Sequence, residues 1–324
     1  MMKKIKILFV LFLGAVLTGC FTTTTNVETP LSKEEQAQLL KKTKPPQTFG
    51  FDVFRIPKGI GFRGRARLHP EHISSVDMIK DGFPLVSVQG RARRDKMNVL
   101  FDLHSNVSWI ELTKAQEFKV DFLGFSKKFA YYHGKYNTGG IPAYAGVISQ
   151  IRFSNFFMEN IPFYVRMARG SLGLQNRGIK KPHVDAVLGY DNLKGLEYIQ
   201  INPFGNKIKL SATIPYVPHD ALLQAKLRIV HVPGFGLAVK GSIDGKPTAI
   251  VLDFVGDLYF SCGGVPVGNK TKSICLGDVC FVDVLTYIIP GKNVPPRIGN
   301  RLLKDYIVTV CPKKGIVYFE RPPE

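Results

Sequence analysis

The chain has 324 residues, 45% of them hydrophobic, which is enough for a packed core in one large domain or two ordinary ones. The formal net charge of +19 favours anionic partners. Helix-period stretches are scarce, whereas 31 Gly, 21 Pro and short runs of Val, Ile, Phe and Tyr predict a mostly β protein rather than a helical one.

The N-terminus has the pattern of an export signal, with Lys3, Lys4 and Lys6 preceding an apolar run over residues 7–17. The run ends in Leu17-Thr18-Gly19-Cys20, which resembles the lipobox of bacterial lipoproteins. The resemblance implies that residues 1–19 are a signal peptide and that the Cys20 thiol is acylated. The acyl chains would anchor the protein in a membrane. The alternative is an ordinary signal peptide that contains a cysteine.

The residue after the lipobox cysteine indicates where the protein goes. Phe21 rather than Asp follows Cys20, so by resemblance to enterobacterial sorting we expect an exported protein anchored at the periplasmic face of the outer membrane. In a Gram-positive organism the anchor would lie at the outer face of the cell membrane. Either place would give the chain a membrane as its first partner.

The charge of the mature chain stays high, because removing three lysines and no acids lowers it only from +19 to +16. Anionic lipid or lipopolysaccharide is the expected surface partner. Nucleic acid is not expected, because the protein is exported and no helix-turn-helix, zinc-finger or RNA-binding signature is present. One interpretation of this charge makes the chain an envelope assembly or surface-binding lipoprotein. It would use a basic face containing Arg91, Arg93, Arg94 and Lys96.

Residues 20–48 are predicted to be a tether between the anchor and the folded part. Ser32-Lys33-Glu34-Glu35 has the form of a capping box, which predicts a short helix to about Lys42, and Pro45-Pro46 ends it. Two β lobes should follow, over residues 49–215 and 216–324, because the remaining sequence states one pattern twice.

The repeated pattern consists of a buried strand ending in Asp, a hairpin, an apolar segment ending in Gly, and two closing strands. In the first half, the Asp strand is Val99-Leu100-Phe101-Asp102 and the Gly segment is Val187-Leu188-Gly189. In the second half, they are Ile250-Val251-Leu252-Asp253 and Ile298-Gly299. This order resembles the aspartic peptidases of the pepsin and retropepsin kind, and Trp109 lies seven residues after the first Asp as in pepsin-like enzymes. The resemblance implies a mostly β, bilobal fold made of two retropepsin-like lobes related by a pseudo-twofold axis.

The family's chemistry implies roles for individual residues. Asp102 and Asp253 would form the catalytic dyad, in which two close carboxylates share one proton, one activating water and the other polarising the scissile carbonyl. The segment Tyr136-Asn137-Thr138-Gly139-Gly140 looks like the flap over the substrate, which makes Tyr136 the flap tyrosine and places Gly139 and Gly140 in the binding site. Tyr131, Tyr132 and Tyr144 compete for that role.

The departures from the family pattern are informative, because neither Asp is followed by Thr-Gly. Leu103 and Phe254 replace the threonines whose hydroxyls bond across the lobe interface, and His104 and Val255 replace the glycines beside the carboxylates. His104 and Val255 therefore belong to the binding site, and His104 either fills space locally or forms a new acid–base pair with Asp102. Gly256, one position late, would partly restore the second loop if that loop is shifted.

Four cysteines besides Cys20 lie in the last third, and in an oxidising compartment they suggest disulfides with three possible connectivities. Cys275 and Cys280 flank a predicted hairpin turn, so their pairing is plausible, and Cys262 and Cys311 would remain. A zinc site is the rival interpretation, although no paired CxxC spacing is present. His69-Pro70-Glu71-His72 is read as a surface loop, so the sequence predicts no metal site and no cofactor.

The leading functional hypothesis is a lipid-anchored, catalytically degenerate relative of these peptidases that binds an extended peptide or a protein partner in the cleft between its lobes. The alternative is an active aspartic endopeptidase of the cell envelope that uses Asp102 and Asp253. The two hypotheses differ in whether Asp102 and Asp253, without the Thr-Gly that follows them in the family, still catalyse cleavage.

Overall fold

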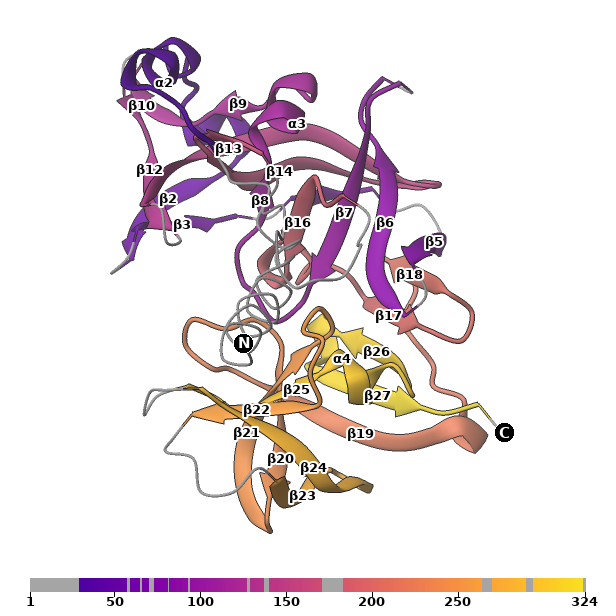
Figure 1. Cartoon of the computed structure of the whole chain (residues 1–324). Coiled ribbons are helices and arrows are strands. Elements are labelled where there is room, and N and C mark those ends of the chain that lie inside the picture. Colours follow the sequence, from indigo (N-terminus) through magenta and orange to yellow (C-terminus); the bar gives the residue numbers. More distant parts are fainter. Residues whose placement is uncertain are drawn as a thin grey trace, which may run out of the picture.

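The computed structural model describes residues 29–56, 59–64, 66–69, 73–80, 82–92, 94–126, 129–136, 140–170, 183–263, 270–289 and 294–322. Within them the fold is mostly β, with one lobe drawn in purple to rose above and a second in orange below (Figure 1). Among these residues, no helix combines the length and apolar character needed to cross a bilayer.

The first lobe is organised around the strand that ends in Asp102. The strands that build it are β6 (Phe83–Gln89), β7 (Lys96–Asp102), β8 (Trp109–Ile110), β13 (Ile141–Phe153), β14 (Phe156–Arg166) and β16 (Ala186–Gly189). β7 pairs antiparallel with β6 and parallel with β16. β16 also pairs antiparallel with β8, which runs parallel to β14. β7 is buried through Leu100 and Phe101, as expected for a strand covered on both faces.

The second lobe repeats the same pairings. Its strands are β20 (Ala238–Ile243), β21 (Lys246–Asp253), β22 (Phe260–Gly263), β23 (Lys270–Leu276), β24 (Val279–Ile289) and β25 (Arg297–Gly299). β21 pairs antiparallel with β20 and parallel with β25, while β25 pairs with β22, which runs parallel to β24. Each lobe also has a long hairpin, β13–β14 in the first and β23–β24 in the second. The chain therefore contains an internal structural duplication.

A glycine marks the crossing point in each lobe. Gly189 pairs with Asp102, and Gly299 pairs with Asp253. A Cβ at Gly189 would lie 2.4 Å from the Val107 carbonyl oxygen, and one at Gly299 would lie 2.1 Å from the Leu258 carbonyl oxygen. Both positions exclude any side chain, because the segment must pass directly beside the Asp loop.

The two lobes share one sheet. Its strands are β5 (Ser74–Lys80), β17 (Tyr198–Asn202), β18 (Lys207–Ser211), β19 (Leu223–Val230), β26 (Ile307–Cys311) and β27 (Ile316–Glu320). The first three pair in the order β5–β18–β17, the last three in the order β26–β27–β19, and β17 pairs with β26 at the centre. At that centre the Gln200 amide donates to the Thr309 hydroxyl at 3.0 Å. The closing strands of both halves thus form a bridge, and one apolar core cluster includes residues of both lobes.

The residues predicted as a tether are docked from Thr29 onward. β1 (Thr29–Pro30) pairs with β15 (Ala168–Arg169), and the Leu31 N–H donates to the Met167 carbonyl oxygen at 2.8 Å. The Ser32 capping box is present and opens α2 (Lys33–Leu39), which ends before the predicted Lys42. Leu31 is buried in the core, so this end of the predicted tether is part of the first lobe.

The remaining described elements are short. They are η1 (Pro46–Phe49), β2 (Asp52–Ile56), β3 (Gly59–Arg63), β4 (Arg67–Leu68), α3 (Leu112–Glu117), β9 (Asp121–Phe122), β10 (Gly124–Ser126), β11 (Phe129–Ala130), β12 (Tyr132–Tyr136), η2 (Tyr190–Asn192), η3 (Asp220–Leu222), α4 (Asn300–Leu303) and η4 (Pro312–Lys314). α4 follows β25 directly, so a short helix comes immediately after the crossing glycine Gly299 in the second half.

Candidate functional site at the lobe interface

The two aspartates at the ends of β7 and β21 lie beside one another, joined by a histidine. His104 Nδ1 contacts Asp102 Oδ1 and lies 3.4 Å from Asp253 Oδ1. The Asp102 and Asp253 side chains are 12% and 4% exposed. Residues from opposite lobes therefore form one buried cluster with an imidazole between two carboxylates.

The carboxylate of Asp253 is held by its own loop. The backbone N–H groups of Val255 and Gly256 donate to Asp253 Oδ1 at 3.1 and 2.7 Å. A Cβ at Gly256 would lie 2.5 Å from Asp253 Oδ2, so only glycine permits this approach. The close glycine thus stands one position later than in the family pattern, as a shifted second loop requires.

The first loop differs, because a side chain rather than the backbone approaches Asp102. His104 lies in a turn after β7, and its ring contacts the Asp102 carboxylate. The neighbouring Ser105 N–H bonds the Asp102 backbone carbonyl at 3.3 Å rather than its carboxylate. The two aspartates therefore have unequal surroundings despite their equivalent places in the duplication.

The electrostatics of this cluster favour a charged imidazole. Burial disfavours the charged form of His104, but the contact with Asp102 and the negative charges of Asp102 and Asp253 outweigh burial and raise its pKa. Arg297, at the start of β25, adds a positive charge, with Nη1 3.7 Å from Asp253 Oδ2. Because arginine is always charged in proteins, Asp253 has a permanent counter-ion that the sequence pattern did not single out.

The threonine replacements are packed as core residues. Leu103 and Phe254 are 0% and 2% exposed and belong to the same apolar cluster. A backbone bond joins the lobes at this point, since the Leu237 N–H donates to the Leu103 carbonyl oxygen at 2.6 Å. Val255 packs against a small cluster of the first lobe that includes Leu85 and Leu100. Apolar contacts therefore replace the side-chain hydrogen bonds expected of the family.

The predicted flap corresponds to the β12–β13 hairpin. Tyr136 ends β12 and pairs with Ile141, but its side chain and the whole of Gly139 lie outside what the structure describes. Gly140 has φ of 59°, the left-handed conformation that glycine adopts readily at a tip. The Tyr132 and Tyr144 rings pack edge to face at 5.6 Å on the same hairpin.

Three packed aromatic side chains support the base of that hairpin. His133 stacks on Tyr164 with ring centroids 3.3 Å apart, and Trp109 lies 5.8 Å from His133. Burial lowers the pKa of His133 to about 4, so this ring is neutral at physiological pH. The Ile60 backbone contributes a donor to His133 and an acceptor for the Tyr164 hydroxyl.

One of the two predicted cysteine pairings is present in the structure and the other is not. Cys275 and Cys280 form a disulfide across the β23–β24 hairpin, where they are register partners. Cys262 and Cys311 are free, so the expectation that they form a second bridge is wrong for this structure. They lie on different sheets, because β22 belongs to the second lobe and β26 to the shared sheet. Cys20 falls outside the described residues.

A second polar cluster, which the sequence analysis missed, lies in the first lobe. Glu111, His183 and Asp185 place one ligand atom each within 4.8 Å of the others. No motif links them, because Glu111 and His183 are 72 positions apart. Only the pairing of β16 with β8, which starts beside these residues, brings them together.

Comparison with known proteins finds a similar structure but no match by sequence. No protein-family model matches the chain, and no curated protein matches it. Among solved structures, the crystal structure of basic 7S globulin from soybean is similar, with 12% identity, a TM-score of 0.46, and coverage of 79% of this chain and 95% of that one. The strand pairings described above carry the fold assignment: the chain is mostly β and bilobal, with the aspartic-peptidase-like arrangement of two Asp loops, two crossing glycines and a shared sheet.

Proposed function

We propose that this protein is a membrane-anchored lipoprotein of the cell envelope that binds an extended peptide or a protein segment between its lobes without cleaving it. One observation carries the proposal: the ring nitrogen of His104 lies between Asp102 and Asp253. In a working dyad the attacking water occupies the space between the carboxylates. Here an imidazole fills it.

The charges point the same way. Two close carboxylates share a proton because both cannot ionise cheaply, and the shared proton supplies the acid that polarises the scissile carbonyl. With a charged His104 between them and Arg297 beside Asp253, mutual repulsion is relieved without that shared proton. The cluster then behaves as an ion-paired connection between lobes rather than as an acid–base pair.

Peptide binding survives such a loss, because an extended chain can add a strand to the edge of a hairpin through backbone hydrogen bonds alone. The β12–β13 hairpin contains the residues that flank the predicted flap. Its β12 edge is the surface on which we expect the bound chain to lie. The partner is expected to be acidic or neutral, since the chain is strongly basic.

Anchoring at Cys20 is the other half of the proposal. It is supported by the lipobox-like Leu17-Thr18-Gly19-Cys20 and by the basic residues and apolar run that precede it. Metabolic labelling with a clickable fatty acid should tag the wild-type chain and fail to tag Cys20→Ser. Equal labelling of the two would contradict lipidation.

Cleavage is tested with the purified full-length chain in detergent and a diverse peptide library, from acid to neutral pH. We expect no cleavage by the wild type and no change with Asp102→Asn or Asp253→Asn. Cleavage that disappears in either variant would replace the binding proposal with the endopeptidase alternative. A statine-type transition-state mimic offers a second measurement, because tight binding requires a space that His104 fills.

The endopeptidase alternative has one observation in its favour. Asp102 and Asp253 do converge, and Asp253 keeps two backbone donors to one oxygen. His104→Gly tests how near this site is to activity, since it removes the blocking ring and restores the family's residue. Activity that appears only in His104→Gly, and is lost again in His104→Gly combined with Asp253→Asn, would identify the wild type as a blocked peptidase.

A further inference from the structure

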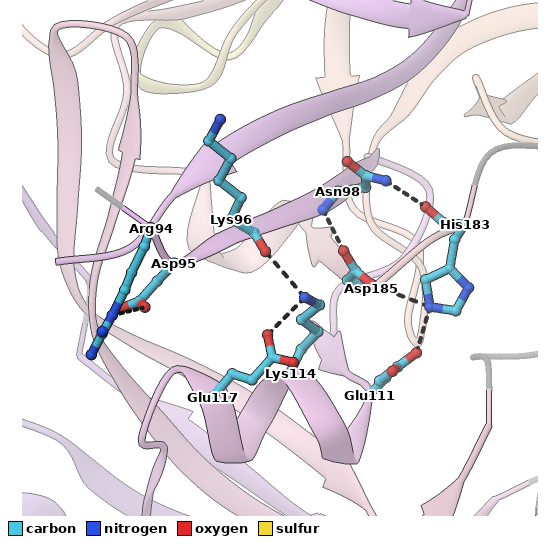
Figure 2. A network of polar contacts seen from close by, with 9 residues as sticks. All are labelled: Arg94, Asp95, Lys96, Asn98, Glu111, Lys114, Glu117, His183 and Asp185. Carbon is cyan, nitrogen blue, oxygen red and sulfur yellow. Dashed lines mark hydrogen bonds and ion pairs between the residues drawn. The ribbon is translucent and has the colours of Figure 1, made fainter. Parts of the chain in front are cut away.

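The Glu111, His183 and Asp185 cluster lies where the chain enters β16 and contacts Asn98 of β7, whereas Asp102 ends β7. His183 Nε2 is 2.8 Å from Glu111 Oε2 and 3.2 Å from Asp185 Oδ1. Figure 2 shows both carboxylates converging on this one nitrogen. Glu111 precedes α3, and Asp185 directly precedes β16.

This arrangement is poorly explained as an ion pair. The Glu111 and Asp185 side chains are only 10% and 7% exposed, and buried charge is costly unless it is compensated. One Nε2–H is best aligned with a single acceptor, yet two carboxylate oxygens lie 2.8 and 3.2 Å from this nitrogen. A cation on the Nε2 lone pair, by contrast, is shared equally by all three atoms.

The positive charge of Lys114 acts on Glu111 and Asp185 through space, without a bond to either carboxylate. Lys114 lies close, but its Nζ bonds Glu117 Oε2 at 2.7 Å and the Lys96 carbonyl oxygen at 3.3 Å. A single imidazolium supplies one full positive charge inside the cluster for two buried carboxylates. A divalent cation would neutralise both.

The ligand atoms are held in place by backbone and amide groups behind them. The Asn98 N–H donates to Asp185 Oδ2 at 2.7 Å, and the Asn98 side-chain amide donates to the His183 carbonyl oxygen at 3.0 Å. The Glu111 N–H donates to the Asp185 carbonyl oxygen at 2.9 Å. Such outer contacts are typical of metal sites, where they fix the orientation of the ligands before the ion arrives.

We propose that Glu111, His183 and Asp185 form a site for a divalent transition-metal cation, with zinc as the ion to test. One imidazole nitrogen and two carboxylate oxygens suit zinc, whose ligand atoms in a tetrahedral site stand roughly 3.3 Å apart. The two nitrogen–oxygen separations, 2.8 and 3.2 Å, are already near that value, and the two oxygens lie within 4.8 Å of each other. His183 is 45% exposed, so a fourth position remains open to water.

The ion would have a structural role. β16 runs from this site to Gly189, the residue that pairs with Asp102. A cation that joins the start of β16 to α3 therefore fixes the strand that crosses beside the first Asp loop. This inference is independent of the proposed function, because it concerns the first lobe whether or not the interlobe site binds peptide.

Zinc binding is measured by calorimetry and thermal unfolding on the full-length chain in detergent, after chelator treatment and dialysis. We expect one zinc per chain and a higher midpoint of unfolding, with affinity reduced by more than about 10-fold in Glu111→Gln and in Asp185→Asn. The matched control is His69→Ala, because His69 Nε2 contacts one carboxylate, Glu159 Oε2, at 3.1 Å. His69→Ala should bind zinc as the wild type does.

Free thiols are the obvious competitors for zinc, so the measurements are repeated in a Cys262→Ser background. Cobalt then serves as a spectroscopic probe: oxygen and nitrogen ligation gives d–d absorption without a thiolate charge-transfer band. A folded wild type that binds no zinc would overturn the proposal, as would equal affinity in wild type, Glu111→Gln and Asp185→Asn. Circular dichroism of each variant shows whether a loss of binding reflects the site or a loss of folding.

Discussion

The N–H of Leu237 donates to the carbonyl oxygen of Leu103 at 2.6 Å, which attaches the segment entering the second lobe to the Asp loop of the first. The Leu103 side chain is fully buried beside this bond. At the same position the peptidase family uses a threonine hydroxyl. At Leu103 the contact between lobes therefore depends on the backbone and on apolar packing.

Leu103→Thr should destabilise the protein, although it restores the family's residue. It removes buried apolar atoms and places a hydroxyl among apolar neighbours, at a cost of about 2–4 kcal/mol. Urea unfolding measures the change. The control is Leu285→Thr on β24, where the side chain is 40% exposed and the expected change is within about 0.5 kcal/mol. A stabilised Leu103→Thr would show that the hydroxyl finds a partner across the interface.

The charge on His104 should contribute stability in mild acid. Its pKa is raised in the folded state, so this contribution is complete below the unfolded value of about 6.5 and is lost as pH rises through the folded value. His104→Gln should therefore cost about 3 kcal/mol or more in mild acid and less in alkali. Chemical unfolding across this pH range measures the difference, and a penalty that grows with pH would contradict the assignment.

Arg297 supplies an independent check on the same cluster. Its positive charge opposes protonation of His104, so Arg297→Gln should raise the His104 pKa further. The imidazole proton resonances report this directly in an NMR titration. An unchanged titration would mean that Arg297 does not face the ring in solution.

His133 should have the opposite pH dependence. Burial lowers its folded pKa to about 4, so below the unfolded value of about 6.5 the unfolded chain takes up a proton that the folded chain does not. Stability should fall by about 3 kcal/mol as pH drops from about 6.5 to about 4. His133→Phe, which keeps a ring against Tyr164, should remove this part of the acid sensitivity. The same slope in wild type and variant would assign the effect to other groups.

The cysteines should differ in reactivity. Burial raises the pKa of Cys311 to about 11 and also raises that of Cys262, which is partly exposed. Since the thiolate is the reactive form, iodoacetamide should label Cys262 slowly in the folded chain and Cys311 only after unfolding. Mass spectrometry without reductant identifies the labelled sites. If neither cysteine is labelled until reductant is added, the two are bridged after all.

Loss of the Cys275–Cys280 disulfide should matter less than loss of a bridge across the fold. The two cysteines are five positions apart, so the bond closes a small loop and contributes about 2 kcal/mol. Cys275→Ser combined with Cys280→Ser should therefore lower the unfolding free energy by about that amount while the protein stays folded. Failure to fold would show that the hairpin depends on the bond.

The fold could be predicted because its signals are local and repeated. Val99-Leu100-Phe101-Asp102 and Ile250-Val251-Leu252-Asp253 are apolar runs long enough for buried strands, and each ends in a carboxylate. The crossing glycines were equally visible. Because the same order of elements occurs in both halves, the assignment of each half supports that of the other.

The site could be predicted only in part. That Asp102 and Asp253 come together follows from the duplication, but the position of the His104 ring depends on how its side chain is oriented across the lobe interface. The prediction of a second bridge between Cys262 and Cys311 was wrong, because an even number of cysteines does not show which sheets carry them. The cluster at Glu111 depends on strand order, which no spacing in the sequence reveals.

If Cys20 carries the proposed lipid, the pairing of β1 with β15 limits how far the folded part can extend from the membrane. Thr29 lies nine positions after Cys20, and a chain of that length covers about 30 Å even when fully extended. With an acyl group on Cys20, the first lobe would therefore stay close to the lipid head groups and reach only a short distance above them. Any chain it captures would have to come to the bilayer, which favours targets that emerge from the same membrane.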